Sequence, residues 1–133
     1  MRVIGRRKEA VAIATATQGS GIVRINRVRI ENVQPEMRRL MVTEPLAIAE
    51  ELAKTVDVDV HVQGGGVIGQ AEATRQAIAH ALLASAGKGA QALRRAFDDY
   101  DRALLVSDAR RNEPHKPSRS SAGPRRHKQR SKR

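Results

Sequence analysis

The glycine-rich segment 64–69 is the part of the sequence that most resembles a ligand-binding motif. Gly64-Gly65-Gly66-Val67-Ile68-Gly69 fits the pattern GxGxxG between an expected strand and an expected helix, as in dinucleotide-binding proteins. The preceding residues, however, alternate Val with Asp and His, whereas the first strand of a dinucleotide-binding fold is a continuous apolar run. No acidic residue between Glu72 and Asp98 is available for a ribose, and no Gly-Lys-Ser/Thr follows to hold phosphates. The sequence therefore disfavours a nucleotide cofactor.

Backbone chemistry gives the same segment a second possible use. A glycine-rich turn exposes N–H groups, and the N-terminus of the helix that follows attracts an anion. An RNA phosphate could bind there, and Arg75, one turn into the expected helix, would point towards it. The alternative is that the glycines serve only a tight turn.

No group of residues predicts catalysis or a metal site. The four histidines, His61, His80, His115 and His127, are dispersed, and the chain has no cysteine. Gly19-Ser20-Gly21 lacks the spacing of a nucleophile elbow. We therefore expect a protein that is not an enzyme and that has no metal, no cofactor and no small-molecule substrate. A small nucleotide-dependent enzyme using the glycine-rich segment remains an alternative.

The distribution of charge predicts a polyanion-binding protein. From Arg110 to the C-terminus there are ten basic residues and one acidic residue, a net charge of +9 out of +11 for the chain. A nearly neutral body with a strongly basic arm is typical of nucleic-acid binding, and a solvated arm without a partner is the alternative. The two aromatic residues, Phe97 and Tyr100, lie outside the arm. Recognition should therefore use phosphates and RNA shape rather than base stacking.

The elements that must position these residues form an α+β pattern. Alternating apolar residues predict strands at 10–17, 22–25, 28–30 and 56–62, and the apolar run 104–106 predicts a last strand. Helical spacing predicts a helix or helix pair at 35–54, a helix beginning near Gln70 and running to 86, and a shorter helix at 91–100. Alanines in the second of these allow a close approach to the sheet. Prolines end regular structure beyond Asp108. We predict one globular domain, residues 1–108, and an extended basic tail, residues 109–133.

Three segments resemble one known family. Gly5-Arg6-Arg7-Lys8 with Ala10 and Ala12, the segment 64–82, and the ending Ser131-Lys132-Arg133 are similar to the opening, central and C-terminal signatures of the ninth small-subunit ribosomal protein family. The segment Leu104-Leu105-Val106-Ser107-Asp108 with the proline-rich tail looks most like the archaeal branch. The resemblance covers nearly the whole chain in the right order.

The resemblance implies a fold similar to the second domain of ribosomal protein S-five, a mixed sheet with helices on one side. It also implies a structural place in the head of the small ribosomal subunit, with rRNA, P-site tRNA and neighbouring ribosomal proteins as partners. No signal peptide or membrane span can be read from the sequence, so we expect a cytoplasmic protein that does not bind a membrane. The expected rRNA-binding residues are Arg6, Arg7, Lys8, Gly64, Gly65, Gly66, Gly69, Gln70, Arg75, Arg110, Arg111, Lys116, Arg119, Arg125, Arg126 and Lys128. The expected tRNA-binding residues are Arg130, Ser131, Lys132 and Arg133. A free nucleic-acid-binding protein of the chromatin type, which would share the basic arm, remains an alternative.

Overall fold

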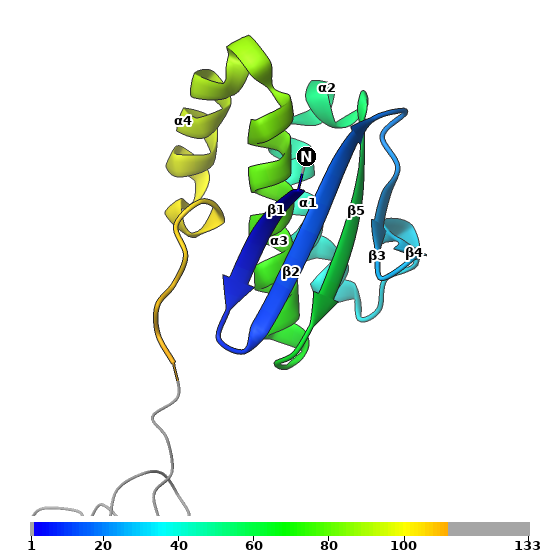
Figure 1. The fold of residues 1–133 in the computed structure, drawn as a ribbon, viewed down its shortest axis with the longest axis vertical. Coiled ribbons are helices and arrows are strands. Elements are labelled where there is room, and N and C mark those ends of the chain that lie inside the picture. The colour runs from blue at the N-terminus through cyan, green and yellow to red at the C-terminus, as the bar shows by residue number, and fades with distance from the viewer. Residues whose placement is uncertain (1, 112–133) are drawn as a thin grey trace, which may run out of the picture.

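The chain forms a five-stranded sheet with helices behind it, in a computed structural model that describes residues 2–111 (Figure 1). The strands are β1 (Arg2–Arg7), β2 (Ala10–Gln18), β3 (Val23–Ile25), β4 (Val28–Arg29) and β5 (Val56–Gln63). The α-helices are α1 (Glu36–Ile48), α2 (Glu50–Ala53), α3 (Val67–Ser85) and α4 (Ala90–Tyr100). Single 3-10 turns are η1 (Ile30–Asn32), η2 (Gly87–Gly89) and η3 (Arg102–Leu104).

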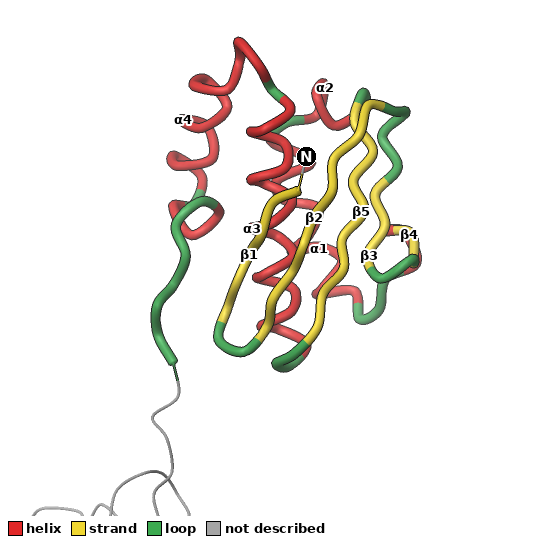
Figure 2. The backbone as a smooth tube through the Cα atoms, viewed as in Figure 1, coloured by secondary structure: helices red, strands yellow, loops and turns green. Residues whose placement is uncertain are grey.

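The sheet is mixed, in the order β1-β2-β5-β3-β4. All neighbours are antiparallel except β3 and β5, which are parallel. The α-helices lie on one side of this sheet, and the other side is free of them (Figure 2). The predicted α+β class with a mixed sheet and helices on one side is therefore confirmed.

Small residues build the core between α3 and the sheet. Strands β2 and β5 bury every second residue, Ala10 to Ala16 on one and Val56 to Val62 on the other, because successive side chains of a strand point to opposite faces. The facing side of α3 also buries alanines, as the sequence predicted. With little side-chain volume between them, the helix and the sheet approach closely.

The structure corrects three predicted elements. The strand predicted at 10–17 is not the first, because β1 precedes it and contains Arg6 and Arg7, while Lys8 is in the turn that follows. The run 104–106 is not a strand. Leu104 ends η3, where it is fully buried, and the Asp101 carboxylate accepts the N–H of Ala103 to start that turn. Helix α3 begins at Val67, three residues earlier than predicted, because Gly64 and Gly65 alone complete the turn after β5.

Candidate nucleic-acid interface

The turn between β1 and β2 and the glycine turn between β5 and α3 lie side by side. A side chain on Gly64 would meet the carbonyl oxygen of Glu9 at 2.5 Å, and one on Gly65 would meet the N of Ala10 at 3.1 Å. Both glycines have positive φ, 80° and 66°, which glycine adopts at least cost. Their first role is therefore a tight turn against the β1–β2 hairpin, which brings Lys8 and the start of α3 to one end of the molecule.

The first turn of α3 has the features of an anion site. Gly66 precedes the helix without any side-chain hydrogen bond to its first N–H groups, and the first turn contains no acidic residue. The Gln70 side chain turns back and donates to the Gly64 carbonyl at 3.1 Å, so it braces the glycine turn. Gly66, Val67 and Ile68 are exposed at this turn, and the first N–H groups of a helix carry a partial positive charge. Among the residues of segment 64–70 that the sequence predicted to bind rRNA, Gly66 and Gly69 are therefore the two whose backbone could contact a phosphate.

Arg7 joins this end of the molecule to the beginning of the basic tail. Its Nε lies 2.7 Å from Glu72 Oε2, and its Nη1 contacts the carboxylate of Asp108. Hydrogen bonds from the side chain and backbone N–H of Arg110, and from Arg7, hold the pKa of Asp108 far below its usual value. Asp108 is therefore ionised at neutral pH and ties Arg110, with a side chain that is 79% exposed, to the end of β1.

The start of the predicted tail, at Arg110, consequently lies beside the β1–β2 turn. Of the predicted binding residues, the structure brings together Lys8, the glycine turn, Arg110 and Arg111, and it places Arg7 in a half-buried ion pair among them. Arg6 lies on the other side of β1 and is exposed. The predicted residues outside the described part of the chain are Lys116, Arg119, Arg125, Arg126, Lys128, Arg130, Ser131, Lys132 and Arg133. The predicted boundary after residue 108 stays a prediction.

Arg75 does not point towards the start of α3, so that prediction of its position is wrong. Because the helix begins earlier than predicted, Arg75 lies more than two turns from its start. Its Nε lies 2.7 Å from Glu44 Oε2, and its Nη2 donates to Asp101 Oδ2 at 2.9 Å. With a side chain that is only 12% exposed, Arg75 fastens α1 and the end of α4 to α3.

Replacing Arg75 with methionine should destabilise the fold by about 2 kcal/mol, because Glu44 and Asp101 would lose their shared cation but remain partly hydrated. Urea unfolding followed by circular dichroism measures the change. Arg95→Met, at an exposed position of α4, is the matched control and should change stability by less than about 0.5 kcal/mol. Equal effects of the two substitutions would contradict the structural role of Arg75.

Sequence reasoning missed three acidic residues that join distant parts of the chain, two at this end of the molecule and one at the other end of the sheet. Glu72 and Asp108 pair with Arg7 across 65 and 101 positions of the chain, and Asp57 accepts three backbone N–H bonds from the β2–β3 loop. These hydrogen bonds lower the pKa of Asp57, and the bond from the Ile22 N–H has the largest effect. For Asp57, the one signal in the sequence was the alternation of β5, which placed its side chain on the face of the sheet away from the core.

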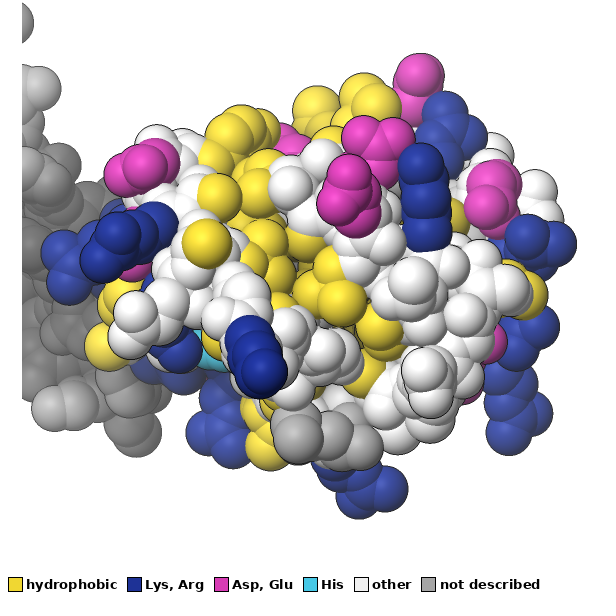
Figure 3. All heavy atoms as spheres, turned by 90° about the horizontal axis from the view of Figure 1, so that it is seen from above, with side chains coloured by type: hydrophobic (Ala, Val, Ile, Leu, Met, Phe, Trp, Pro, Cys, Tyr) yellow, Lys and Arg dark blue, Asp and Glu magenta, His cyan; other side chains and the backbone are white. Residues whose placement is uncertain are grey.

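The opposite end of the molecule has a different character. Figure 3 shows apolar side chains gathered in the centre of this end, with acidic and basic side chains around them. Lys54 of this end pairs with Glu50 at 3.6 Å. Among residues 2–111, no three potential metal ligands cluster, and no helix combines the length and hydropathy needed to span a membrane.

Comparisons with known proteins agree with the predicted resemblance. The sequence model of the family described as ribosomal protein S9/S16 matches residues 5–133. Small ribosomal subunit protein uS9 of Methanococcus vannielii is 47% identical over 131 residues, which cover 98% of this chain and 96% of the relative. The protein of the same name from Methanococcus maripaludis strain C7 is 46% identical with the same coverage. Both organisms fit the predicted archaeal branch.

Proposed function

Because the chain belongs to the ribosomal protein S9/S16 family, we propose that it is a structural component of the head of the small ribosomal subunit. In this role the protein binds small-subunit rRNA and neighbouring ribosomal proteins and performs no chemistry. The observation that carries the proposal is the similarity to uS9 proteins over nearly the whole length of both chains.

The distribution of charge supports rRNA as the main partner. Lys8, the uncapped start of α3 and the root of a tail with nine net positive charges lie at one end of the molecule. A phosphate bound at the first turn of α3 would be close to the cations of the hairpin and of the tail root. Binding would therefore release counterions and weaken steeply with salt.

The tail gives the proposal a second step, contact with P-site tRNA. Arg130, Ser131, Lys132 and Arg133 end the chain and carry three positive charges. They have no aromatic ring for base stacking, so they would hold tRNA through its phosphates. The contacts of Asp108 with Arg7 and Arg110 hold the start of the predicted tail against the end of β1, and the tail would extend from there towards the tRNA.

Sedimentation after a high-salt wash tests the structural role. We expect the tagged full-length chain to sediment with the small subunit through a sucrose gradient, because an integral component is held by many contacts at once. Release into the soluble fractions, with the subunits otherwise intact, would contradict the proposal. Binding of duplex DNA as tight as binding of rRNA would then favour a free nucleic-acid-binding protein.

A further inference from the structure

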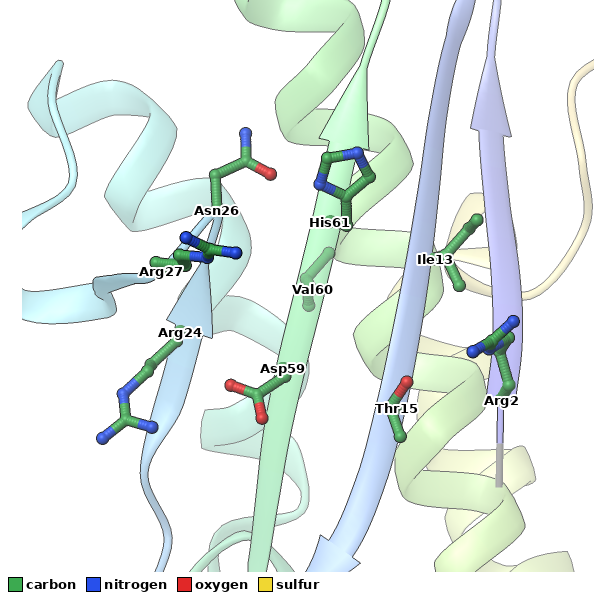
Figure 4. Close-up of a pocket in the computed structure, with 9 residues that line it drawn as sticks. All are labelled: Arg2, Ile13, Thr15, Arg24, Asn26, Arg27, Asp59, Val60 and His61. Carbon is green, nitrogen blue, oxygen red and sulfur yellow. The ribbon is translucent and has the colours of Figure 1, made fainter.

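The face of the sheet turned away from the helices carries a basic depression. Strand register places Arg2, Thr15, Asp59 and Arg24 in one row across β1, β2, β5 and β3. The row crosses a shallow hollow of about 750 Å³ (Figure 4), and its lining residues come from four strands and the β3–β4 turn. The expected rRNA-binding residue Arg6 lies on the same face of β1 as Arg2 but does not line the hollow.

Cations stand on both sides of the hollow. Arg2 lies on β1 and Arg24 on β3, three strand spacings or roughly 14 Å apart. Arg27 joins Arg24 from the β3–β4 turn (Figure 4). Within residues 2–111, none of these three arginines forms an ion pair. Their charge is therefore available to an external anion.

Arg27 occupies this place at a cost to the backbone. Its φ is +70°, in the left-handed region where a side chain costs roughly 1 kcal/mol or more and glycine does not. Asn26, with φ +49°, fixes the turn by accepting the N–H of Val62 at 2.9 Å and donating to the Val62 carbonyl at 3.1 Å. The hairpin thus presents a guanidinium where glycine would be more stable. Strain of this kind is characteristic of positions that serve binding.

The floor of the hollow is mixed in polarity, and its one ring is the imidazole of His61. Thr15, Asp59 and His61 point out of the sheet, Ile13 also lines the hollow, and no Phe, Tyr or Trp is among the lining residues (Figure 4). Stacking of unpaired bases is therefore limited to His61, unlike on RNA-binding sheets that carry several aromatic residues. The other acidic residue of this face, Asp57, is held by the N–H groups of the β2–β3 loop. Asp59 is left as an acceptor between two groups of cations.

We propose that this open sheet face is a second RNA-binding surface that fits the minor groove of an RNA double helix. Arg2 contacts phosphates on one side of the groove, and Arg24 and Arg27 contact those on the other. Asp59 accepts a hydrogen bond from a ribose 2′-hydroxyl, a donor that DNA lacks. The inference rests on the proposed rRNA binding and adds a second contact face, so that the body would bridge two RNA segments.

Arg27→Gly separates binding from stability, because the two should change in opposite directions. In full-length protein, removal of the strain should raise the melting temperature by roughly 2–4 °C. The affinity for transcribed small-subunit rRNA should fall on the order of fivefold, and the slope of log K against log salt should drop by about 1. Arg27→Lys, which keeps the charge, should retain most of the affinity. Lys88→Gln, in η2 at the opposite end, should change neither quantity.

A pair of probes tests the role of Asp59. With a 20-base-pair RNA duplex and the DNA duplex of the same sequence, Asp59→Ala should reduce the preference for RNA, whereas Arg24→Gln should weaken both complexes. If wild-type protein binds rRNA but Arg27→Gly and Arg24→Gln match it in affinity and salt slope, the sheet proposal is overturned and the proposed function stands. If the variants bind rRNA as the wild-type protein does but no longer join assembled subunits, this face would instead be assigned to a protein partner. If wild-type protein does not bind rRNA, both proposals fail.

Discussion

Replacing Gly5 with alanine is expected to destabilise the folded domain by about 3 kcal/mol, a large effect for one methyl group. Gly5 lies in β1 where α3 crosses it, and it is buried. A Cβ at this position would meet the backbone N of Ala77 at 2.6 Å and its Cβ at 3.1 Å, and the carbonyl oxygen of Ala73 is closer still. Backbone atoms of a helix cannot move aside as the end of a flexible side chain can. The strand or the helix would have to shift, which urea unfolding would register.

Gly69→Ala is the matched control for this prediction. It is the same substitution, made within α3 where the helix passes the β1–β2 turn. Its Cβ would meet the Arg7 carbonyl oxygen at 3.7 Å and the Ala10 Cβ at 3.8 Å, which are ordinary contact distances. Because Gly69 lies within α3, alanine should leave stability unchanged or raise it by up to about 1 kcal/mol. Equal losses at both positions would show that the close approach of β1 to α3 is not the cause.

The elements that could be predicted from the sequence are those whose residues alternate or repeat strongly. Val56, Val58, Val60 and Val62 alternate with polar residues, so β5 and its buried face were predicted correctly. The alanines of α3 likewise predicted a close approach to the sheet, which the structure confirms. These signals are local, because the pattern can be recognised from residues that lie only a few positions apart in the sequence.

Strand β1 had no such local signal. Val3 is the one apolar residue on its inward side, which also presents Gly5 and Arg7. The strand forms because β2 pairs with it along its length and because the buried Gln76 of α3 accepts the N–H of Arg6 at 2.8 Å on its other edge. Both partners become visible only when the chain has folded.

In the candidate interface, too, local features could be predicted from the sequence and contacts between distant residues could not. Composition alone predicted the basic tail, and chain order predicted the glycine turn before α3. The ion pairs of Arg7 and Arg75 join residues 26 to 101 positions apart, so periodicity could not separate these arginines from the exposed ones. The row of residues on the open sheet face depends on register across four strands, which no spacing in the sequence encodes.

Removing residues 112–133 is expected to produce the largest functional loss. The deleted segment carries eight basic residues and one acidic residue, whereas Asp108, Arg110 and Arg111 remain. If most of these cations contact phosphates, affinity for small-subunit rRNA at moderate salt should fall on the order of 10³-fold, with a much flatter salt dependence. The melting temperature should stay unchanged, because the contacts of Asp108 with Arg7 and Arg110 are kept. Unchanged rRNA affinity would mean that the body alone carries binding.

Two double substitutions then distinguish the end of the tail from the rest of it. Lys132→Gln with Arg133→Gln removes two charges at the predicted tRNA contact, and Arg125→Gln with Arg126→Gln removes two at a predicted rRNA contact. In reconstituted subunits, the first pair should weaken P-site tRNA binding several-fold more than the second, because phosphate attraction is short-ranged in physiological salt, where the Debye length is about 8 Å. If both pairs weaken tRNA binding equally, the tail acts through its total charge, and the assignment of tRNA contact to its last residues is wrong.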